Sequence, residues 1–282
     1  MKKFSIILGA IILMLFVTLV IWGVYCDNTI AITNYCVNNA KNDAKLKFVV
    51  ITDLHNKEYG EKNADLAELV KEQNPDFIAV CGDMVNRGDP DTTKMKDVLE
   101  KLSKKIAPTY CCLGNHERDN AAKFGTDFKS ETNSTGAVLL DNEYIKFTKN
   151  GKSVLIGGMS DYPYYEFYTP DDDVPSRTLW EEFAEKAKNN FTILLHHQPE
   201  YIAEDAKKTD IDLIVCGHTH GGQIQLPFIG GVIAPNQGLF PKYDKGEFDL
   251  DGTKMIVCAG LSNTVFIPRI NNQVEIGVVT VV

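Results

Sequence analysis

Short apolar runs alternate with segments of helical spacing in the first half of the chain. The runs at residues 46–52, 77–81 and 109–113 read as buried strands. Between them, residues 62–73 and 92–105 repeat apolar positions every three or four residues, which is typical of amphipathic helices. This alternation predicts a largely parallel sheet with right-handed crossovers. Functional side chains in such sheets gather outside the carboxyl ends of the strands.

The second half of the chain has shorter runs that are joined by tight turns. They read as strands over residues 137–140, 144–148, 153–159, 191–195, 211–216, 223–226, 254–259, 265–268 and 273–281. The first three have the turn-bounded pattern of antiparallel strands. We expect a helix over 176–189 and an irregular loop over 161–175. The whole pattern predicts an α/β fold in which two mixed sheets, each flanked by helices, form a four-layer α/β/β/α sandwich.

The N-terminal segment is a long run without charge. After two lysines, no Asp, Glu, Lys or Arg occurs from Phe4 to Cys26, a length that spans a bilayer as a helix. No small-residue cleavage site ends the run, which favours a retained anchor over a cleaved signal peptide. Trp22 and Tyr25 suit a membrane interface. We therefore expect a transmembrane anchor over 1–26, a polar tether with some strand character over 27–44 and a globular catalytic domain over 45–282.

The charges beside this segment predict how it crosses the membrane. Lys2, Lys3 and the terminal amine favour an N-terminus inside the cell, although Lys41 and Lys45 lie beyond the segment and weaken the bias. This orientation predicts a single-pass protein of the cell membrane with an extracytoplasmic domain.

Composition limits the possible partners. The chain has 282 residues, 44% of them hydrophobic, which is enough for one large core. Its net charge of -9 argues against a nucleic-acid polymer as partner, because phosphate backbones are bound by clustered Lys and Arg. Most of the 7 cysteines lie inside apolar runs and read as small buried hydrophobes. We expect a monomer.

Polar side chains follow five of the predicted strands at the point where each strand ends. These motifs are Asp53-Leu54-His55, Gly82-Asp83, Gly114-Asn115-His116, His197-Gln198-Pro199 and Gly217-His218-Thr219-His220. On an extended backbone, side chains two residues apart share one face, which would pair Asp53 with His55. Imidazole and carboxylate groups together suit divalent transition metals. Each motif alone occurs by chance in many chains, but the ordered set predicts a shared metal site.

The order of these motifs resembles the calcineurin-like metallophosphoesterase superfamily over roughly residues 45–282. The longer form Gly217-His218-Thr219-His220-Gly221-Gly222-Gln223, with the N-terminal membrane segment, resembles its bacterial membrane-anchored phosphodiesterases. That branch includes enzymes acting on UDP-2,3-diacylglucosamine-type pyrophosphates. The resemblance implies two divalent or trivalent metal ions, Mn, Fe or Zn, that activate a hydroxide for attack on phosphorus.

The resemblance also assigns roles by position. It implies that the first metal is held by Asp53, His55 and His220, the second by Asn115, His197 and His218, and that Asp83 bridges both. His116 would contact the phosphate and assist the leaving group without binding metal.

Three assignments keep alternatives. His197 matches the histidine that the family places two residues before a proline, but His196 stays possible as the ligand. Arg87 is a candidate for contacting the substrate phosphate or an ordinary exposed loop arginine. An aromatic cluster in the irregular loop would meet a lipid or nucleobase, or pack on the domain surface; it comprises Tyr162, Tyr164, Tyr165, Phe167 and Tyr168.

We therefore expect a dinuclear metal-dependent hydrolase of phosphodiester or pyrophosphate bonds in a lipid-linked or cell-envelope substrate. Two alternatives stay open. One is a phosphomonoesterase or nucleotide phosphodiesterase, and the other is a binding protein that uses metals only to hold a ligand. His116 argues against the last, because a binding protein has no need of a leaving-group residue.

Overall fold

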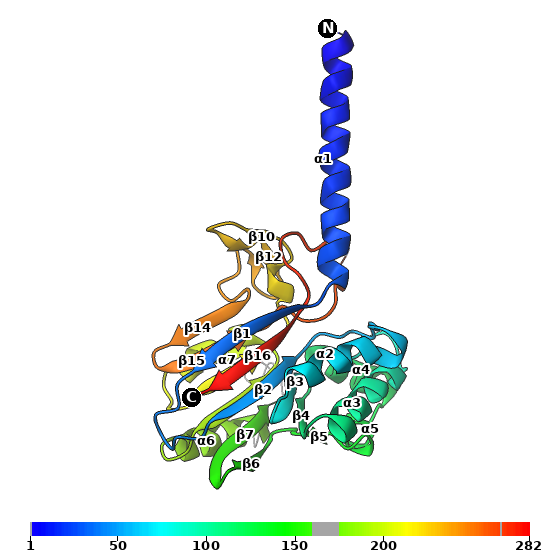
Figure 1. The fold of residues 1–282 in the computed structure, drawn as a ribbon. Coiled ribbons are helices and arrows are strands. Elements are labelled where there is room, and N and C mark those ends of the chain that lie inside the picture. The colour runs from blue at the N-terminus through cyan, green and yellow to red at the C-terminus, as the bar shows by residue number, and fades with distance from the viewer. Residues whose placement is uncertain (1, 160–174, 266) are drawn as a thin grey trace.

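Two six-stranded sheets pack face to face with helices on both outer faces (Figure 1). The computed structural model describes residues 2–159, 175–265 and 267–282. The predicted four-layer α/β/β/α sandwich with mixed sheets is confirmed. The irregular loop predicted over 161–175 falls almost wholly outside the described residues, and so does its aromatic cluster.

Both sheets have a parallel centre. The first has the order β1 (Ala31–Val37), β16 (Glu275–Val281), β2 (Leu46–Ile51), β3 (Phe77–Cys81), β4 (Thr109–Cys112) and β5 (Val138–Leu139). The second has the order β14 (Gly246–Leu250), β15 (Thr253–Val257), β9 (Leu213–Cys216), β8 (Thr192–His196), β7 (Lys152–Met159) and β6 (Glu143–Lys149). Two small hairpins pair β10 (Gln225–Leu226) with β11 (Gly230–Gly231) and β12 (Ile233–Ala234) with β13 (Gly238–Leu239). Antiparallel pairs join β16 to β2, β14 to β15 and β6 to β7.

Helices cover the outer face of each sheet. The helices of the described residues, including the projecting α1, are α1 (Lys2–Asn28), α2 (Ala64–Glu72), α3 (Thr93–Lys105), α4 (Asn115–Phe124), α5 (Phe128–Ser134), α6 (Pro175–Ala187) and α7 (Pro199–Ala206). Two 3₁₀ turns are η1 (Glu61–Asn63) and η2 (His220–Gly222). Leu66 of α2 and Val98 of α3 are buried in the core on the first sheet. Phe183 of α6 and Ile202 of α7 are buried on the second.

Strand β2 illustrates why continuous apolar runs become central strands. Phe48 and Val50 face the space between the sheets, whereas Val49 and Ile51 face the helical layer. All four side chains are fully buried. Because strand side chains alternate between faces and both faces are covered here, each burial contributes about 1.5–3 kcal/mol.

Two of the predicted strands are wrong, and two helices have no hydrophobic pattern from which they could be predicted. Residues 137–140 do not form an antiparallel strand, since β5 pairs in parallel with β4. Residues 265, 267 and 268 have no strand structure. The hydrophobic pattern does not predict α4 and α5, because their sequences contain few apolar residues to reveal a helical period.

The strand character expected within the tether over 27–44 is present in its central part. Residues Ala31–Val37 form β1, which pairs in parallel with β16 along its whole length. β1 is an edge strand with alternating exposed positions, so its sequence appears polar although it belongs to the sheet. The globular domain therefore begins before residue 45.

Helix α1 projects away from the sandwich (Figure 1) and is long and apolar enough to cross a membrane, with a mean hydropathy of 3.0. Its last turns are built into the domain. Gly23 and Cys26 are buried, and the carbonyl of Cys26 accepts a hydrogen bond from the amide of Val274 at 2.9 Å. Three residues after α1 the chain enters β1, so no free linker separates the helix from the sheet.

Candidate metal centre

Five strand ends, three from the first sheet and two from the second, bring acidic and imidazole groups together. Three groups have ligand atoms within 4.8 Å of one another, namely Asp53, His55 and His220; His55, Asp83 and His116; and Asp83, His197 and His218. The two histidines of the loop after β9 thus fall into different groups. His55 and Asp83 each belong to two groups, so the three form one continuous cluster.

The distances within this cluster suit ligands around shared cations. The Nε2 atom of His55 lies 3.6 Å from Oδ1 of Asp53 and 3.7 Å from Oδ2 of Asp83. His197 Nε2 lies 3.1 Å from Oδ2 of Asp83, and His220 Nε2 lies 3.9 Å from Oδ1 of Asp53. Ligand atoms that each lie about 2.0–2.2 Å from one metal ion stand roughly 3–4 Å from each other.

Several of these atoms are buried without a hydrogen-bond partner among the described residues. They are Oδ1 of Asp53, both ring nitrogens of His55, Oδ1 of Asn115 and Nε2 of His197. A buried polar atom without a partner costs about 1–3 kcal/mol, so a cluster of them needs an explanation. Nitrogen and oxygen atoms that converge in this way fit divalent transition metals.

The Nε2 atom of His218 also has side-chain neighbours outside the cluster. It lies 3.0 Å from Nδ2 of Asn236, in the turn between β12 and β13, and 3.5 Å from Oε1 of Glu200. Asn236 also donates to Glu200 at 3.2 Å. If Nε2 of His218 binds metal, this turn must release it.

The backbone at the site has an unusual conformation. Positive φ angles occur at Asp53 (54°), His55 (46°), Asp83 (53°), His218 (71°) and His220 (49°). The expected extended backbone at Asp53–His55 is therefore wrong, and the side chains meet because the chain turns at each residue. A non-glycine residue in this region costs about 1–2 kcal/mol, and such strain clusters at functional sites.

Two glycines make room for the carboxylates. A Cβ at Gly217 would lie 2.0 Å from Oγ1 of Thr52 and 2.5 Å from Oδ2 of Asp53. A Cβ at Gly114 would lie 2.2 Å from Oδ1 of Asp83. Any larger residue at either position would displace a carboxylate of the cluster.

Backbone carbonyls orient two of the imidazoles. The Nδ1 atom of His197 lies 2.6 Å from the carbonyl of Cys81, and Nδ1 of His220 lies 3.2 Å from the carbonyl of Ser262. In the neutral form of either ring, a proton on Nδ1 would make Nε2 the acceptor that faces the carboxylates. Arg269, which is fully buried, donates to the same Ser262 carbonyl at 2.7 Å.

Glu117 holds the loop that carries Asp83. Its Oε2 atom accepts from the amides of Asp83 and Gly114, both at 2.8 Å, and Oε1 accepts from those of Met84 and Val85 at 2.6 and 3.1 Å. This role is not apparent from the strand-end motifs. The spacing Gly114-x-x-Glu117 carries a signal, since Glu at the third position of a helix commonly caps it.

His116, Arg87 and His196 also have defined places. His116 is in the second group, 3.9 Å from Oδ2 of Asp83, and Nε of Arg87 lies 3.2 Å from its Nε2. The half-exposed guanidinium of Arg87 also pairs with Asp119 at 3.2 Å. His196 belongs to none of the three groups, and its Nδ1 faces the carbonyl of Met159 at 3.2 Å.

Burial and neighbouring charges set the pKa values. Burial opposes ionisation of Asp83, but His197 outweighs it and holds the carboxyl pKa well below its usual range. Burial likewise disfavours charged His197, but Asp83 raises the pKa of that imidazole to about 10. Burial lowers the pKa of His116 to about 4 and those of His218 and His220 to about 3. His116, His218 and His220 are therefore neutral at pH 7. For His218 and His220 this is the form that binds metal, whereas His197 would have to release a proton to a bound cation.

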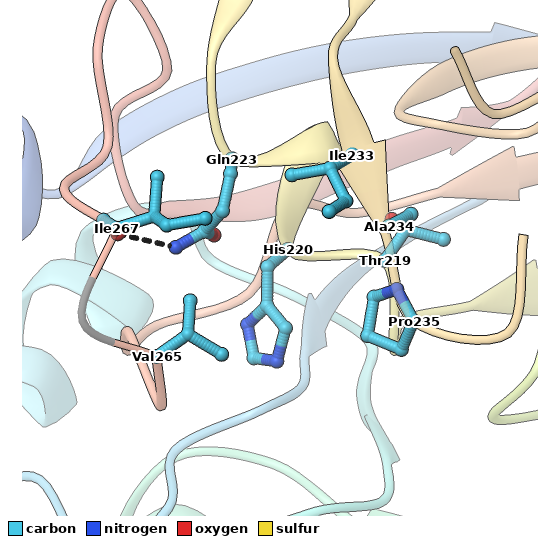
Figure 2. A pocket seen from close by; sticks show the side chains of 8 residues that line it. All are labelled: Thr219, His220, Gln223, Ile233, Ala234, Pro235, Val265 and Ile267. Carbon is cyan, nitrogen blue, oxygen red and sulfur yellow. Dashed lines mark hydrogen bonds between the residues drawn. The ribbon is translucent and has the colours of Figure 1, made fainter. Parts of the chain in front are cut away.

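An apolar pocket adjoins the cluster at His220. It has a volume of about 280 Å³, and its wall includes Ile233, Pro235, Val265 and Ile267. In Figure 2 the ring of His220 lies between Val265 and Pro235 at one end of this wall. The pocket thus joins a polar metal centre to an apolar surface.

Comparisons with known proteins agree with this site. The family model of calcineurin-like phosphoesterases matches residues 46–222. The chain is 30% identical over 243 residues to YkuE, an uncharacterized metallophosphoesterase of Bacillus subtilis. The aligned region covers 83% of this chain and 78% of the relative. It is 28% identical over 197 residues to the phosphodiesterase YaeI of Escherichia coli, covering 69% and 67%.

The fold is also found among solved structures. The structure of TT1561 from Thermus thermophilus aligns over 78% of this chain and 91% of that protein, with a TM-score of 0.52 at 12% identity. This similarity concerns the fold alone. The extent of the family match and of the relationship to YkuE identifies the chain as a member of the calcineurin-like phosphoesterases, and thus as a metal-dependent phosphoester hydrolase.

Proposed function

We propose that the chain is a membrane-anchored hydrolase of phosphodiester or pyrophosphate bonds in substrates with a lipid part. The main support for this proposal is the apolar pocket, whose wall ends at His220 of the metal cluster (Figure 2). A phosphoryl group at the cluster would leave the adjoining apolar part of the same molecule beside Ile233, Val265 and Ile267. Apolar contacts of this kind contribute about 25 cal/mol per Å² buried.

The chain offers two overlapping ligand sets. Asp53, His55 and His220 would hold one cation, and Asn115, His197 and His218 the other, with Asp83 between them. The partnerless atoms of Asp53, His55, Asn115 and His197 support this division. Bound Mn, Fe or Zn ions would polarise the phosphoryl oxygens and lower the pKa of a water molecule.

His116 and Arg87 supply the remaining functions. The two ring nitrogens of His116 lie 3.3 and 3.2 Å from the amide and Nε of Arg87. His116 is neutral at pH 7, so its one N–H becomes available to an oxygen of the phosphate or of the leaving group when one of these contacts opens. Arg87 lies beside it and brings a positive charge that suits a second phosphate oxygen. Neither residue is needed to hold the cations in this scheme.

The carboxylate between the two ligand sets gives the sharpest test of the hydrolytic mechanism. Asp83→Asn should abolish hydrolysis of an aryl phosphodiester by the Mn-loaded full chain, while Asp249→Asn, at an exposed carboxylate of β14, should retain it. Circular dichroism would verify that both variants are folded. Wild-type turnover by Asp83→Asn would contradict the mechanism.

The substrate class needs a separate comparison. A diacyl lipid pyrophosphate in mixed micelles should have a lower KM than its water-soluble deacylated form, and an aryl diester should be cleaved faster than the aryl monoester. Equal KM values would remove the lipid part of the proposal. Preference for the monoester would favour a phosphomonoesterase.

The location of the domain is also part of the proposal. The N-terminal lysines support an N-terminus inside the cell and a domain outside the cytoplasm. A cysteine introduced at exposed Val138 should react with a membrane-impermeant maleimide in intact cells. Reaction only after lysis would place the domain in the cytoplasm.

A further inference from the structure

Two segments beside the end of α1 are apolar and carry no charged residue. Residues 213–241 contain no Asp, Glu, Lys or Arg, and neither do residues 255–268, in a chain of which 24% is charged. Among the described residues of these segments, the exposed large apolar side chains are Leu226, Phe228, Ile229, Leu239, Phe240, Val265 and Ile267. We call these seven side chains the apolar rim. Phe228 is completely exposed, and Leu239 is 68% exposed.

The apolar rim lies at the end of the domain from which α1 leaves. In Figure 1 the β10 and β12 hairpins extend toward the same side of the sandwich as α1. The loop with Val265 and Ile267 touches the helix directly, since a Cβ at Gly23 would lie 3.2 Å from Cβ of Pro268. Exposed side chains on this loop and on the hairpins therefore stand close to the base of the helix.

Helix length places this contact at the membrane boundary. A helix needs about 20 apolar residues to cross the hydrocarbon core of a bilayer. Counted from Phe4, the first residue of the uncharged run, the far boundary falls near Gly23. Exposed Trp22 and Tyr25 mark the same level, because such rings prefer the membrane–water interface. Gly23 is the residue that meets the loop of the apolar rim.

The join between α1 and the domain keeps the rim in this position. Cys26 is completely buried, its carbonyl accepts from Val274, and the next carbonyl, that of Asp27, accepts from Nζ of Lys57. Helix α1 then continues within three residues into β1. A domain fixed in this way has little freedom to turn its apolar rim away from the bilayer.

We infer that the apolar rim is a second membrane contact, which docks the domain on the lipid bilayer entered by α1. The inference rests on the proposed membrane anchor. Because Val265 and Ile267 also line the pocket at His220, docking places the pocket wall against the lipid surface. The face has no charged residues in these two segments, so the contact is hydrophobic and insensitive to salt.

Site-specific fluorescence in nanodiscs that contain one full-length chain tests this contact. An environment-sensitive dye is attached to cysteine at Phe228→Cys or Leu239→Cys, in a background with exposed Cys36 replaced by Ser. Val138→Cys is the matched control, since Val138 is an exposed apolar side chain of β5, at the far edge of the first sheet. A dye at Leu13→Cys reports separately whether α1 is embedded.

If the rim docks on the bilayer, dyes at positions 228 and 239 should have blue-shifted emission. Spin-labelled lipid should quench this emission and aqueous iodide should not, both at low and at high salt. The control at 138 should show the reverse. Iodide quenching at 228 and 239 equal to that at 138 would overturn the inference even with the dye at 13 buried in lipid. Protection from iodide without lipid quenching, seen only when two chains share a disc, would assign the rim to a second copy and also overturn it. Iodide quenching at 13 would refute the anchor itself.

Discussion

Glu117→Gln should loosen the loop that carries Asp83, although the change replaces one oxygen by one nitrogen. Each carboxylate oxygen of Glu117 accepts from two backbone amides, as described above. A glutamine side chain has a single accepting oxygen, and its NH₂ group only donates. Whichever way the amide turns, two buried N–H groups therefore face another donor.

The size of the destabilisation follows from the two N–H groups that are left without an acceptor. Each buried N–H without an acceptor costs about 1–3 kcal/mol, which gives about 2–6 kcal/mol for the pair. Burial and the nearby charge of Asp83 raise the pKa of Glu117, so relief of that repulsion offsets part of the loss. We expect the free energy of unfolding to fall by about 2–5 kcal/mol.

Urea unfolding of the full chain in detergent, followed by circular dichroism, measures this change. The control is Glu100→Gln, which removes an exposed ion pair with Lys104 at 2.7 Å and should leave the free energy of unfolding almost unchanged, because solvent screens such a pair. The variant should also retain less metal after dialysis, because its amides no longer hold Asp83. A free energy of unfolding for Glu117→Gln that matches the control would refute the proposed role of these hydrogen bonds.

Further substitutions test other parts of the site. Gly217→Ala should lose bound metal in elemental analysis, because its Cβ overlaps Asp53, whereas Gly88→Ala, which has open space around it, should retain it; equal metal contents would contradict the steric argument. Arg87→Ala should lower kcat/KM for an aryl phosphodiester roughly 10- to 100-fold, the loss of one charged hydrogen bond to phosphate, and change stability little; an unchanged kcat/KM would leave Arg87 as a surface residue. Arg269→Met should lower the free energy of unfolding by roughly 2–6 kcal/mol, because the carbonyls of Ala259 and Ser262 lose their buried donor, and a stability within about 1 kcal/mol of wild type would show that these hydrogen bonds are not needed.

The sequence predicts the site best where the order and direction of the strands determine the positions of the residues. In a parallel sheet the central strands deliver their next residues to the same edge, which groups the motifs after β2, β3 and β4 in the first sheet and those after β8 and β9 in the second. The face-to-face packing of the two sheets then joins the two groups. That rule cannot separate His196 from His197, because both follow the same apolar run. The structure separates them, since His197 faces Asp83 while His196 faces the carbonyl of Met159.

The parts that could not be predicted depend on distant backbone groups. Glu117 acts on amides some thirty residues earlier in the chain. The strand character of the segment that forms β1 does not reveal that it joins the sheet, because its partner β16 lies near the other end of the sequence. The positive φ angles of Asp53 and His55 have only a weak signature in the residue types, since Asp and His adopt them more often than most residues. They occur together with hydrogen bonds from the amides of these two residues to the carbonyls of Gly82 and Asp83, at 3.1 and 3.0 Å.

One loop connects the base of α1 to the metal cluster. Arg269 donates to the carbonyls of Ala259 and Ser262, and the second of these also faces Nδ1 of His220. Five residues further on, the amide of Val274 holds the end of α1 through the carbonyl of Cys26. The apolar helix and a candidate metal ligand are thus fixed by the same short segment. The direction in which the site faces is consequently a property of the folded domain, and β1, which follows α1 directly, is a structural part of that join and not a spacer.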